Sequence, residues 1–327
     1  MRLNLIWEAR TMSDRFASLP KRVGVAIVAI PTILWLAYQG GFYFFLLVAV
    51  ISSLSLYEFY RLAELKGIYP QKSVGLFFGL VINGAFLFER LYVEILKLFP
   101  HFGLNIPAFN VYQLLLSVVL LFLIVTAFVE LFGKRGSPIQ NAGATVLGVF
   151  FISLFFGTLI RTREMFPFGF PVQRFFPGTM ASEPDLALVD RWGGYTVMSI
   201  FATIWICDTA AYFGGMTLGR HKLFERVSPN KTWEGAVFGF VFSVLSMLLA
   251  ENLFLGYLGV WHAVVIGMMI GCFGQVGDLV ESRFKRDAGV KDSSSIIPGH
   301  GGVYDRFDSL VFVSPIVYLY FVFVIFS

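Results

Sequence analysis

Four aspartates in the C-terminal half of the chain stand where apolar runs begin or end: Asp208, Asp278, Asp305 and Asp308. Asp305 and Asp308 are three residues apart, and on a helix such a pair shares one face. Two carboxylates on one face repel each other unless a cation joins them, and oxygen ligands of this kind suit Mg²⁺. The alternative is a helix cap, because acids favour the positive N-terminal end of a helix.

A glycine-rich turn, Pro298-Gly-His-Gly-Gly302, precedes the last pair of aspartates. Glycines let successive backbone N–H groups converge on an anion. The turn is not a P-loop, because no Lys-Ser or Lys-Thr pair follows the glycines. Basic residues lie on both sides of it. A metal held by carboxylates, with basic side chains and N–H groups on phosphate oxygens, is what nucleotidyl transfer requires. The pattern therefore indicates displacement at phosphorus.

A second polar stretch lies upstream, between Asp208 and Gly235. Its segment Ser228-Pro-Asn-Lys-Thr232 supplies hydroxyls, an amide and an ammonium group within five residues, which suits contacts to a triphosphate. The alternative is a cap for the helix that begins at 233, where Ser, Thr and Glu are favoured in any case.

The composition excludes a water-soluble fold. Hydrophobic residues make up 57% of the chain and charged residues 14%, whereas soluble domains carry about 25% charged residues. Most of the surface must therefore face lipid or other membrane helices. Two cysteines allow neither a disulfide framework nor a zinc site. The net charge of +4 is modest, and we expect no nucleic-acid partner.

Apolar runs predict an all-α polytopic integral membrane protein with about nine transmembrane helices. The predicted spans are 23–38, 42–60, 74–92, 111–132, 143–161, 194–214, 233–255, 260–280 and 309–326. Eight or ten stay open, because only a Gln-Gly-Gly turn separates the first two. With the N-terminus in the cytoplasm, 19 Lys and Arg fall on the cytoplasmic side and 6 on the other. This asymmetry predicts a cytoplasmic N-terminus, and it places both polar stretches on the cytoplasmic side.

The chain divides, on this prediction, into two parts. Residues 1–190 form N-terminal membrane helices, about five spans, with an outside loop at 162–193. Residues 191–327 form a C-terminal catalytic membrane domain, about four spans, with cytosolic loops at 215–232 and 281–308.

With these residues in hand, the chain resembles the phosphatidate cytidylyltransferase family, also called CDP-diacylglycerol synthase. The family's C-terminal pattern is matched at every position, by Ser282, Phe284, Lys285, Arg286, Lys291, Asp292, Pro298, His300, Gly301, Gly302, Val303, Asp305, Arg306, Phe307 and Asp308. The resemblance covers 205–309 and is only topological before that. Two upstream positions depart from the pattern: Ala210 stands where Gly is usual, and Met216 where many members carry Lys or Arg.

The resemblance implies that the phosphate of phosphatidate attacks the α-phosphorus of CTP, giving CDP-diacylglycerol and pyrophosphate for phospholipid biosynthesis. It implies a metal centre at Asp278, Asp305 and Asp308 that binds Mg²⁺, with K⁺ as a reported partner ion, and further catalytic roles for Arg286 and Lys291. The candidate substrate-binding residues are Asp208, Tyr212, Arg220, Ser228, Asn230, Lys231, Thr232, Glu234, Lys285, Asp292, His300, Gly301, Gly302 and Arg306. The resemblance also implies a homodimer among membrane lipids, in a bacterial inner membrane, with the active site facing the cytoplasm.

Three alternatives stay open. The first is a cytidylyltransferase for another lipid phosphate, ether-linked or isoprenoid, since no feature of the sequence indicates which hydrocarbon chains the acceptor carries. The second is an Mg²⁺-dependent phospho-sugar transferase, which would not require the His-Gly-Gly-x-x-Asp-Arg-x-Asp order. The third is an ion-coupled transporter using Asp208 and Asp278, which predicts acids near the midplane of broken helices. Here the acids cluster at the ends of spans on one face, which argues against it.

Overall fold

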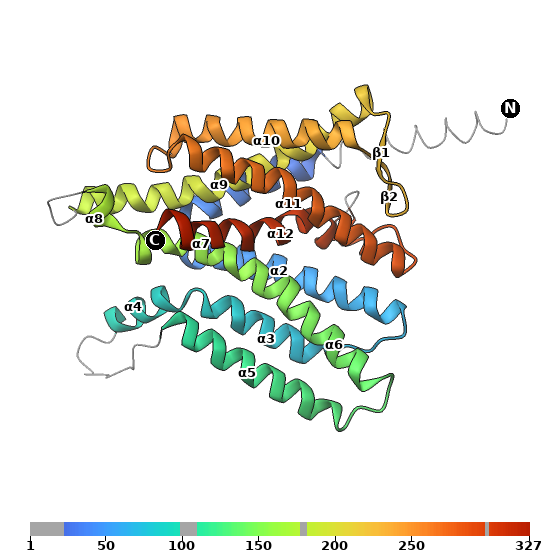
Figure 1. Ribbon diagram of the computed structural model, residues 1–327. Helices are drawn as coiled ribbons and strands as arrows, with labels where there is room; N and C mark the ends of the chain where they lie inside the picture. The colour runs from blue at the N-terminus through green and yellow to red at the C-terminus, as the bar shows by residue number, and fades with distance from the viewer. Residues whose placement is uncertain (1–22, 99–109, 177–181, 298–300) are drawn as a thin grey trace.

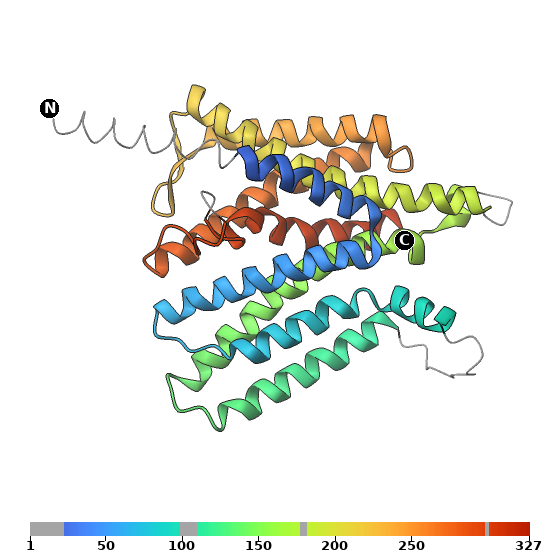
Figure 2. The same cartoon turned by 180° about the vertical axis from the view of Figure 1, so that it is seen from behind.

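The computed structural model describes residues 23–98, 110–176, 182–297 and 301–327. Nearly all of them lie in helices that run side by side in one bundle (Figures 1 and 2). The helices are Val23–Gln39, α2 (Gly41–Leu65), α3 (Lys72–Ala85), α4 (Phe88–Leu98), α5 (Val111–Glu130), α6 (Pro138–Gly148), α7 (Phe155–Gly169), α8 (Val172–Phe175), α9 (Glu183–Leu218), α10 (Trp233–Phe254), α11 (Val260–Asp287) and α12 (Tyr304–Tyr320).

Two π-helical turns and one hairpin complete the described structure. The turn η1 (Val149–Leu154) joins α6 to α7, and η2 (Phe321–Ile325) continues α12. Strands β1 (Lys222–Phe224) and β2 (Ser228–Thr232) pair antiparallel, with Lys222 opposite Thr232. This hairpin connects α9 to α10 and projects from one end of the bundle (Figure 1).

Successive helices of the C-terminal half pack as neighbours: α9 on α10, α10 on α11 and α11 on α12. The α12 helix also packs against α7 and α2, which link it to the α3, α5 and α6 side of the bundle (Figure 1). The core lies between these layers and is built from large buried side chains, among them Phe156, Phe201 and Phe321.

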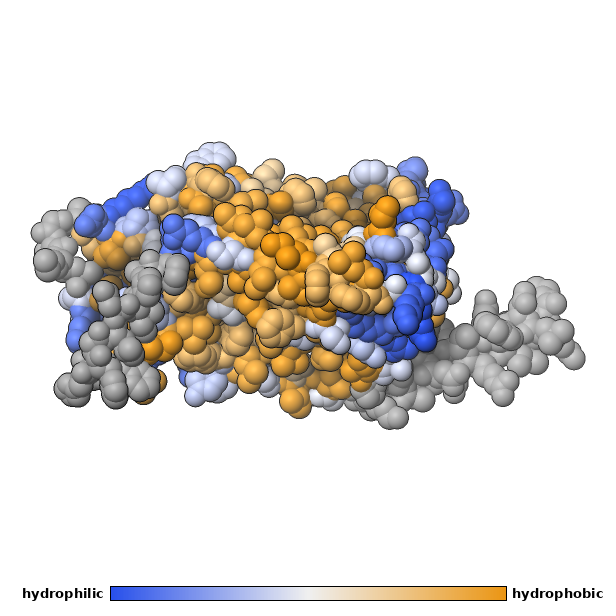
Figure 3. Space-filling model, turned by 90° about the horizontal axis from the view of Figure 1, so that it is seen from below, coloured by the Kyte–Doolittle hydropathy of each residue, from blue (hydrophilic) through white to orange (hydrophobic). Residues whose placement is uncertain are grey.

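The prediction of an all-α membrane protein is confirmed. Among the described residues seven helical segments are long and apolar enough to span a membrane, or eight if α3 and α4, bent by 71°, form one span. The remaining predicted span is the shorter Val23–Gln39 helix. Figure 3 shows an apolar band with hydrophilic residues at both ends. On α5 this surface includes the exposed Leu116, Leu120 and Ile124.

The segment predicted as an outside loop, 162–193, is helical over most of its described residues. The α7 helix continues to Gly169, because Arg163 and Glu164 on its last turns are buried in ion pairs with Asp190 and Arg90. The α9 helix already begins at Glu183, so the predicted division between residues 190 and 191 falls within this helix. Proline and charge indicated a loop here, but buried pairing satisfies the charges within helices.

The predicted cytosolic loops are also shorter than expected. The α9 helix runs to Leu218 and the hairpin occupies most of the rest of 215–232. The α11 helix runs to Asp287 and α12 begins at Tyr304, so only the middle of 281–308 is a connection. The hairpin and this connection lie at the same end of the bundle (Figure 1).

Candidate active site

The β1–β2 hairpin is fixed to α10 by the polar residues around its second strand. Thr232 is the N-cap of α10, and its Oγ1 accepts a hydrogen bond from Gly235 N at 3.2 Å. Glu234 accepts from the backbone N–H groups of Arg220 and His221 at 3.1 and 3.2 Å. A capping hydroxyl and an acid in the first turn are what a helix start favours. Thr232 and Glu234 therefore hold the hairpin in a fixed orientation relative to α10.

The position of Lys231 follows from this orientation of the hairpin. Its Nζ lies 2.5 Å from Asp278 Oδ2, although the two residues come from β2 and α11. The hairpin therefore places one ammonium group in contact with an acid of the C-terminal stretch. This contact joins the two polar stretches of the sequence into one site.

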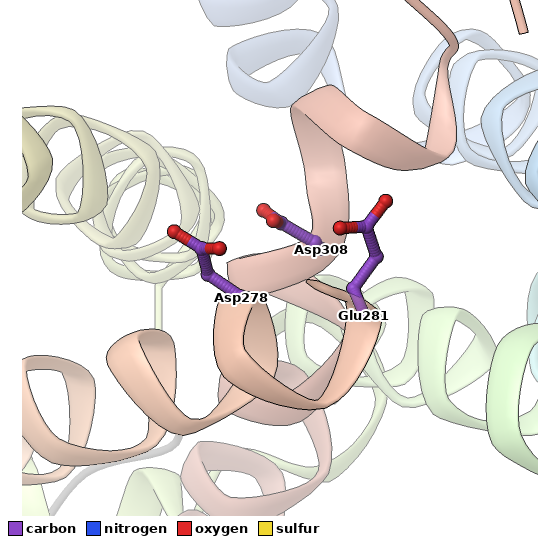
Figure 4. Close-up of side chains that lie close together, drawn as sticks. All are labelled: Asp278, Glu281 and Asp308. Atoms are coloured by element: carbon purple, nitrogen blue, oxygen red, sulfur yellow. The ribbon is translucent and has the colours of Figure 1, made fainter. Parts of the chain in front are cut away.

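Three carboxylates converge beside it. Asp278 and Glu281 on α11 and Asp308 on α12 each offer an oxygen, and these oxygens all lie within 4.8 Å of one another (Figure 4). The helices approach closely at Gly277, where a Cβ atom would lie 2.6 Å from the carbonyl oxygen of Asp308. A larger residue at Gly277 would therefore separate the acids.

Glu281 is the most buried of the three, at 1% exposure. Its Oε2 lies 2.6 Å from Lys285 Nζ as an ion pair. Its Oε1 has no hydrogen-bond partner within the part of the chain that the structure describes. Buried polar groups are almost always satisfied, so Oε1 is the oxygen available to a further cationic ligand. Carboxylate oxygens such as these three are ligands that suit Mg²⁺.

Asp305 lies outside this group of three. Its carboxylate accepts hydrogen bonds from Lys285 Nζ at 2.7 Å, from Gly302 N at 2.7 Å and from Ser293 N at 3.0 Å. Its side chain is 3% exposed. The structure therefore shows Asp305 engaged in holding the connection between α11 and α12.

Lys231, Asp278 and Asp308 line a cavity of about 790 Å³ whose lining is partly polar and partly apolar, whereas Glu281 lies behind the lining. The polar lining residues include Asp208, Asn230, Lys231, Thr232, Gln275, Asp278, Asp305, Arg306 and Asp308. The apolar lining residues include Val25, Ala26, Ala29, Ile30, Ile33, Trp205, Leu223 and Phe307. Such a cavity offers contacts both to a charged group and to an aliphatic group.

Comparisons with known proteins identify the family of this chain. A sequence profile of the Cytidylyltransferase family matches residues 20–324. The chain belongs to the cytidylyltransferase family. Over 317 residues it is 30% identical to the phosphatidate cytidylyltransferase of Synechocystis, covering 92% of this chain and 96% of that one. Over 310 residues it is 31% identical to that of Bacillus subtilis, covering 94% and 98%. A stretch of 126 residues is 46% identical to that of Staphylococcus aureus strain COL, covering 38% and 48%.

In this cytidylyltransferase the predicted site residues divide into two sets. Those on the cavity wall are Asp208, Tyr212, Asn230, Lys231, Thr232, Asp278, Asp305, Arg306 and Asp308. Those that do not line it are Arg220, Ser228, Glu234, Lys285, Arg286, Lys291, Asp292, Gly301 and Gly302. His300 lies outside the described residues.

Several residues of the second set have other partners. The exposed Arg286 donates from Nη1 to Val290 O at 2.8 Å. Buried Lys285 bridges Glu281 and Asp305. Lys291 and Asp292 are exposed on the connection before α12. These residues shape or flank the site of the cytidylyltransferase rather than facing into it.

Sequence reasoning missed two residues of this cytidylyltransferase site. Glu281 follows Asp278 by three positions on one helix, the same spacing that singled out Asp305 and Asp308, so the signal for it was present. Gln275, on the cavity wall, donates from Nε2 to Ala236 O at 3.0 Å and to Gly271 O at 2.7 Å. A lone glutamine in an apolar run carries no comparable signal.

Proposed function

We propose that this enzyme transfers the cytidylyl group of CTP to phosphatidate, giving CDP-diacylglycerol and pyrophosphate in phospholipid biosynthesis. A phosphate oxygen of phosphatidate forms a bond to the α-phosphorus of CTP, and the bond from that phosphorus to pyrophosphate breaks. The observation that carries the proposal is the convergence of Lys231 with three carboxylates, two of which line a cavity that also has apolar lining residues. The curated relatives of this chain bear the corresponding name.

The mixed lining of the cavity suits the two substrates. Its polar residues offer an ammonium group, a guanidinium group and an amide at Lys231, Arg306 and Asn230, which fit phosphate oxygens. Its apolar residues, including Ile30, Ile33 and Phe307, fit the hydrocarbon next to a lipid phosphate. This pairing favours a lipid acceptor over a phospho-sugar.

We propose Mg²⁺ as the cofactor and Asp278, Glu281 and Asp308 as the residues that would hold it. Glu281 takes the place that the sequence assigned to Asp305. Bound there, the ion would neutralise negative charge on the triphosphate. The close oxygens support this assignment, as does Glu281 Oε1, which has no hydrogen-bond partner among the described residues. A K⁺ partner stays a prediction.

The chain's own groups have separate tasks. Lys231 offsets the charge of Asp278 and is placed to contact phosphate oxygens in the same cavity. Lys285 joins Glu281 to Asp305 at 2.6 and 2.7 Å and thereby fixes α11 relative to α12. Because positioning and charge neutralisation supply most of the catalysis in phosphoryl-type transfers, no covalent nucleophile is needed.

The setting of the enzyme belongs to the same proposal. We place it in a bacterial inner membrane, as a homodimer among membrane lipids, with its N-terminus and active site on the cytoplasmic side. The 19 to 6 division of Lys and Arg between the two sides supports this orientation. CTP is a cytoplasmic metabolite, so a site on that side can reach it.

The test is an assay of the purified protein in detergent with labelled CTP, phosphatidate and Mg²⁺. We expect labelled CDP-diacylglycerol and an equal amount of pyrophosphate. Parallel reactions with an ether-linked and an isoprenoid phosphate identify the acceptor, and the variant Asp308→Asn gives the background. Product no greater than that background with any acceptor would overturn the proposal.

A further inference from the structure

Glu58 on α2 is a fully buried carboxylate, 0% exposed, far from the predicted site in the sequence. It makes no ion pair with Lys or Arg in the portion of the chain covered by the structure. A buried carboxylate without a cation must be stabilised by hydrogen bonds. Where those hydrogen bonds come from therefore shows what the residue does.

All of the donors lie on the connection before α12 or on its first residues. Glu58 Oε1 accepts from Ser294 Oγ at 2.6 Å and from Val303 N at 3.0 Å. Glu58 Oε2 accepts from Tyr304 N at 2.8 Å. Val303 is the N-cap of α12 and Tyr304 its first residue, and the N–H groups at the start of a helix have no partner within it. Glu58 therefore caps α12 from a different helix.

The same carboxylate is linked to Asp305. Ser293 Oγ lies 2.8 Å from Glu58 Oε2 and 3.1 Å from Asp305 Oδ2, so its one proton is shared between the two acids. Gly302 lies between them, and a Cβ atom there would overlap Ser293 Oγ and Glu58 Oε2. The turn is thus packed directly against Glu58.

We propose that Glu58 is a positioning residue for the reaction, which α2 supplies to hold the start of α12 and with it Asp305 and Asp308. The α2 and α12 helices pack together, so a rigid element supports the contact (Figure 1). Asp305 and Asp308 lie on the first turns of α12, and their place depends on where that helix begins. The N-terminal half of the chain thereby contributes to a site whose acids all come from the C-terminal half.

This inference rests on the proposed function, and its test uses the full-length enzyme in detergent with CTP, phosphatidate and Mg²⁺. Glu58→Gln keeps the size of the side chain but replaces one acceptor oxygen with a donor facing N–H or O–H groups. We expect kcat to fall at least ~10-fold, since a misplacement of about 1 Å can cost about 10²-fold. We also expect the Mg²⁺ concentration for half-maximal rate to rise. Glu58→Asp, which keeps both acceptors, should restore part of the rate.

Glu164→Gln is the matched control. Glu164 is also buried, at 2% exposure, and accepts from Gly41 N at 2.9 Å and Arg90 Nε at 2.7 Å. Gly41 begins α2, about 26 Å along the helix from Glu58 at 1.5 Å per residue. Loss of packing alone would lower the melting temperature in both variants and leave the Mg²⁺ dependence of the folded protein unchanged.

If Glu58→Gln does not fold, Ser294→Ala tests the same contact by removing one donor. It should change kcat and the Mg²⁺ dependence in the same direction. Wild-type kcat and Mg²⁺ dependence in Glu58→Gln, or in Ser294→Ala where only that variant folds, would overturn the inference. An inactive wild-type enzyme would instead overturn the proposed function.

Discussion

Lys231 Nζ lies 2.5 Å from Asp278 Oδ2, and this pair joins the β1–β2 hairpin to the acids of α11. Both side chains are partly exposed, at 27% and 33%, and both line the cavity. A partly solvated ion pair contributes little to stability on its own, about 0–1 kcal/mol. The pair therefore matters for where it places the ammonium group. Because the ion pair is weak, Lys231 can leave the Asp278 carboxylate and contact phosphate oxygens at little cost in free energy.

Replacing Lys231 with Met should remove the one lysine that faces the cavity from the described residues. We expect kcat/KM for CTP to fall by at least ~10²-fold, the scale of losing one electrostatic stabiliser. The melting temperature should change little, because the pair is partly exposed. Lys222→Met is the control: Lys222 lies on the same hairpin, is exposed, and donates to Pro229 O at 2.6 Å. Equal losses in the two variants would contradict the assigned role of Lys231.

Asp308→Asn and Asp305→Asn should both lose at least ~10²-fold in rate, but for different reasons. Asp308 is one of three carboxylates that repel one another without a cation. Asp308→Asn removes one of these charges, so it should not lower the melting temperature in EDTA. It should raise the Mg²⁺ concentration that gives half-maximal rate. Asp305 pairs with buried Lys285 at 2.7 Å, and breaking a buried pair costs about 3–5 kcal/mol. Asp305→Asn should therefore melt earlier with or without Mg²⁺. If Asp308→Asn lowered the melting temperature in EDTA and Asp305→Asn did not, Asp305 would instead be assigned as a metal ligand.

Glu281→Gln tests the residue that replaces Asp305 in the proposed metal centre. The uncharged amide is a poorer ligand for a hard cation, so the Mg²⁺ concentration for half-maximal rate should rise. Asp287→Asn is a suitable control, because Asp287 lies on the same helix but pairs with Lys66 on the exposed surface, at 3.6 Å. An unchanged Mg²⁺ dependence in Glu281→Gln would exclude Glu281 as a ligand.

The sequence was informative where a signal is local. Each predicted span falls on a described helical segment, except 74–92, which falls on the bent pair α3 and α4. The agreement is expected, because a run of apolar residues in lipid must satisfy its backbone hydrogen bonds within a helix. The aspartates were found because acids are rare in such a chain. Contacts between distant segments were not predictable: that Asp305 faces Lys285, or that Glu58 caps α12, depends on how helices pack. The helical ends of 162–193 were missed because their charges are paired in three dimensions.

Gly302→Ala should lower both activity and stability. The added methyl group would overlap Ser293 Oγ and Glu58 Oε2, so the turn before α12 must move. Overpacking of this kind costs about 1–3 kcal/mol. Gly143→Ala is the control, since Gly143 lies within α6 with nothing within 4 Å of the added atom. That change should leave activity intact and raise stability by up to about 1 kcal/mol. A Gly302→Ala enzyme with wild-type rate and melting temperature would show that the turn tolerates displacement.

The orientation can be tested with two single cysteines placed at opposite ends of the bundle. Ser182, the N-cap of α9, and Glu225, on the hairpin after that helix, are both exposed. The helix between them is long and apolar enough to span a membrane, so the two positions should lie on opposite sides. Both native cysteines, Cys207 and Cys272, are first replaced with Ala, because Cys272 is exposed.

In intact cells a membrane-impermeant maleimide should label Ser182→Cys, and should label Glu225→Cys only after the membrane is permeabilised. This outcome follows from the distribution of Lys and Arg, since cytoplasmic segments hold their excess. The readout is cysteine labelling alone, so enzymatic activity is not required. Labelling of Glu225→Cys in intact cells with protection of Ser182→Cys would invert the orientation and place the cavity with Lys231 and Asp278 away from the cytoplasm.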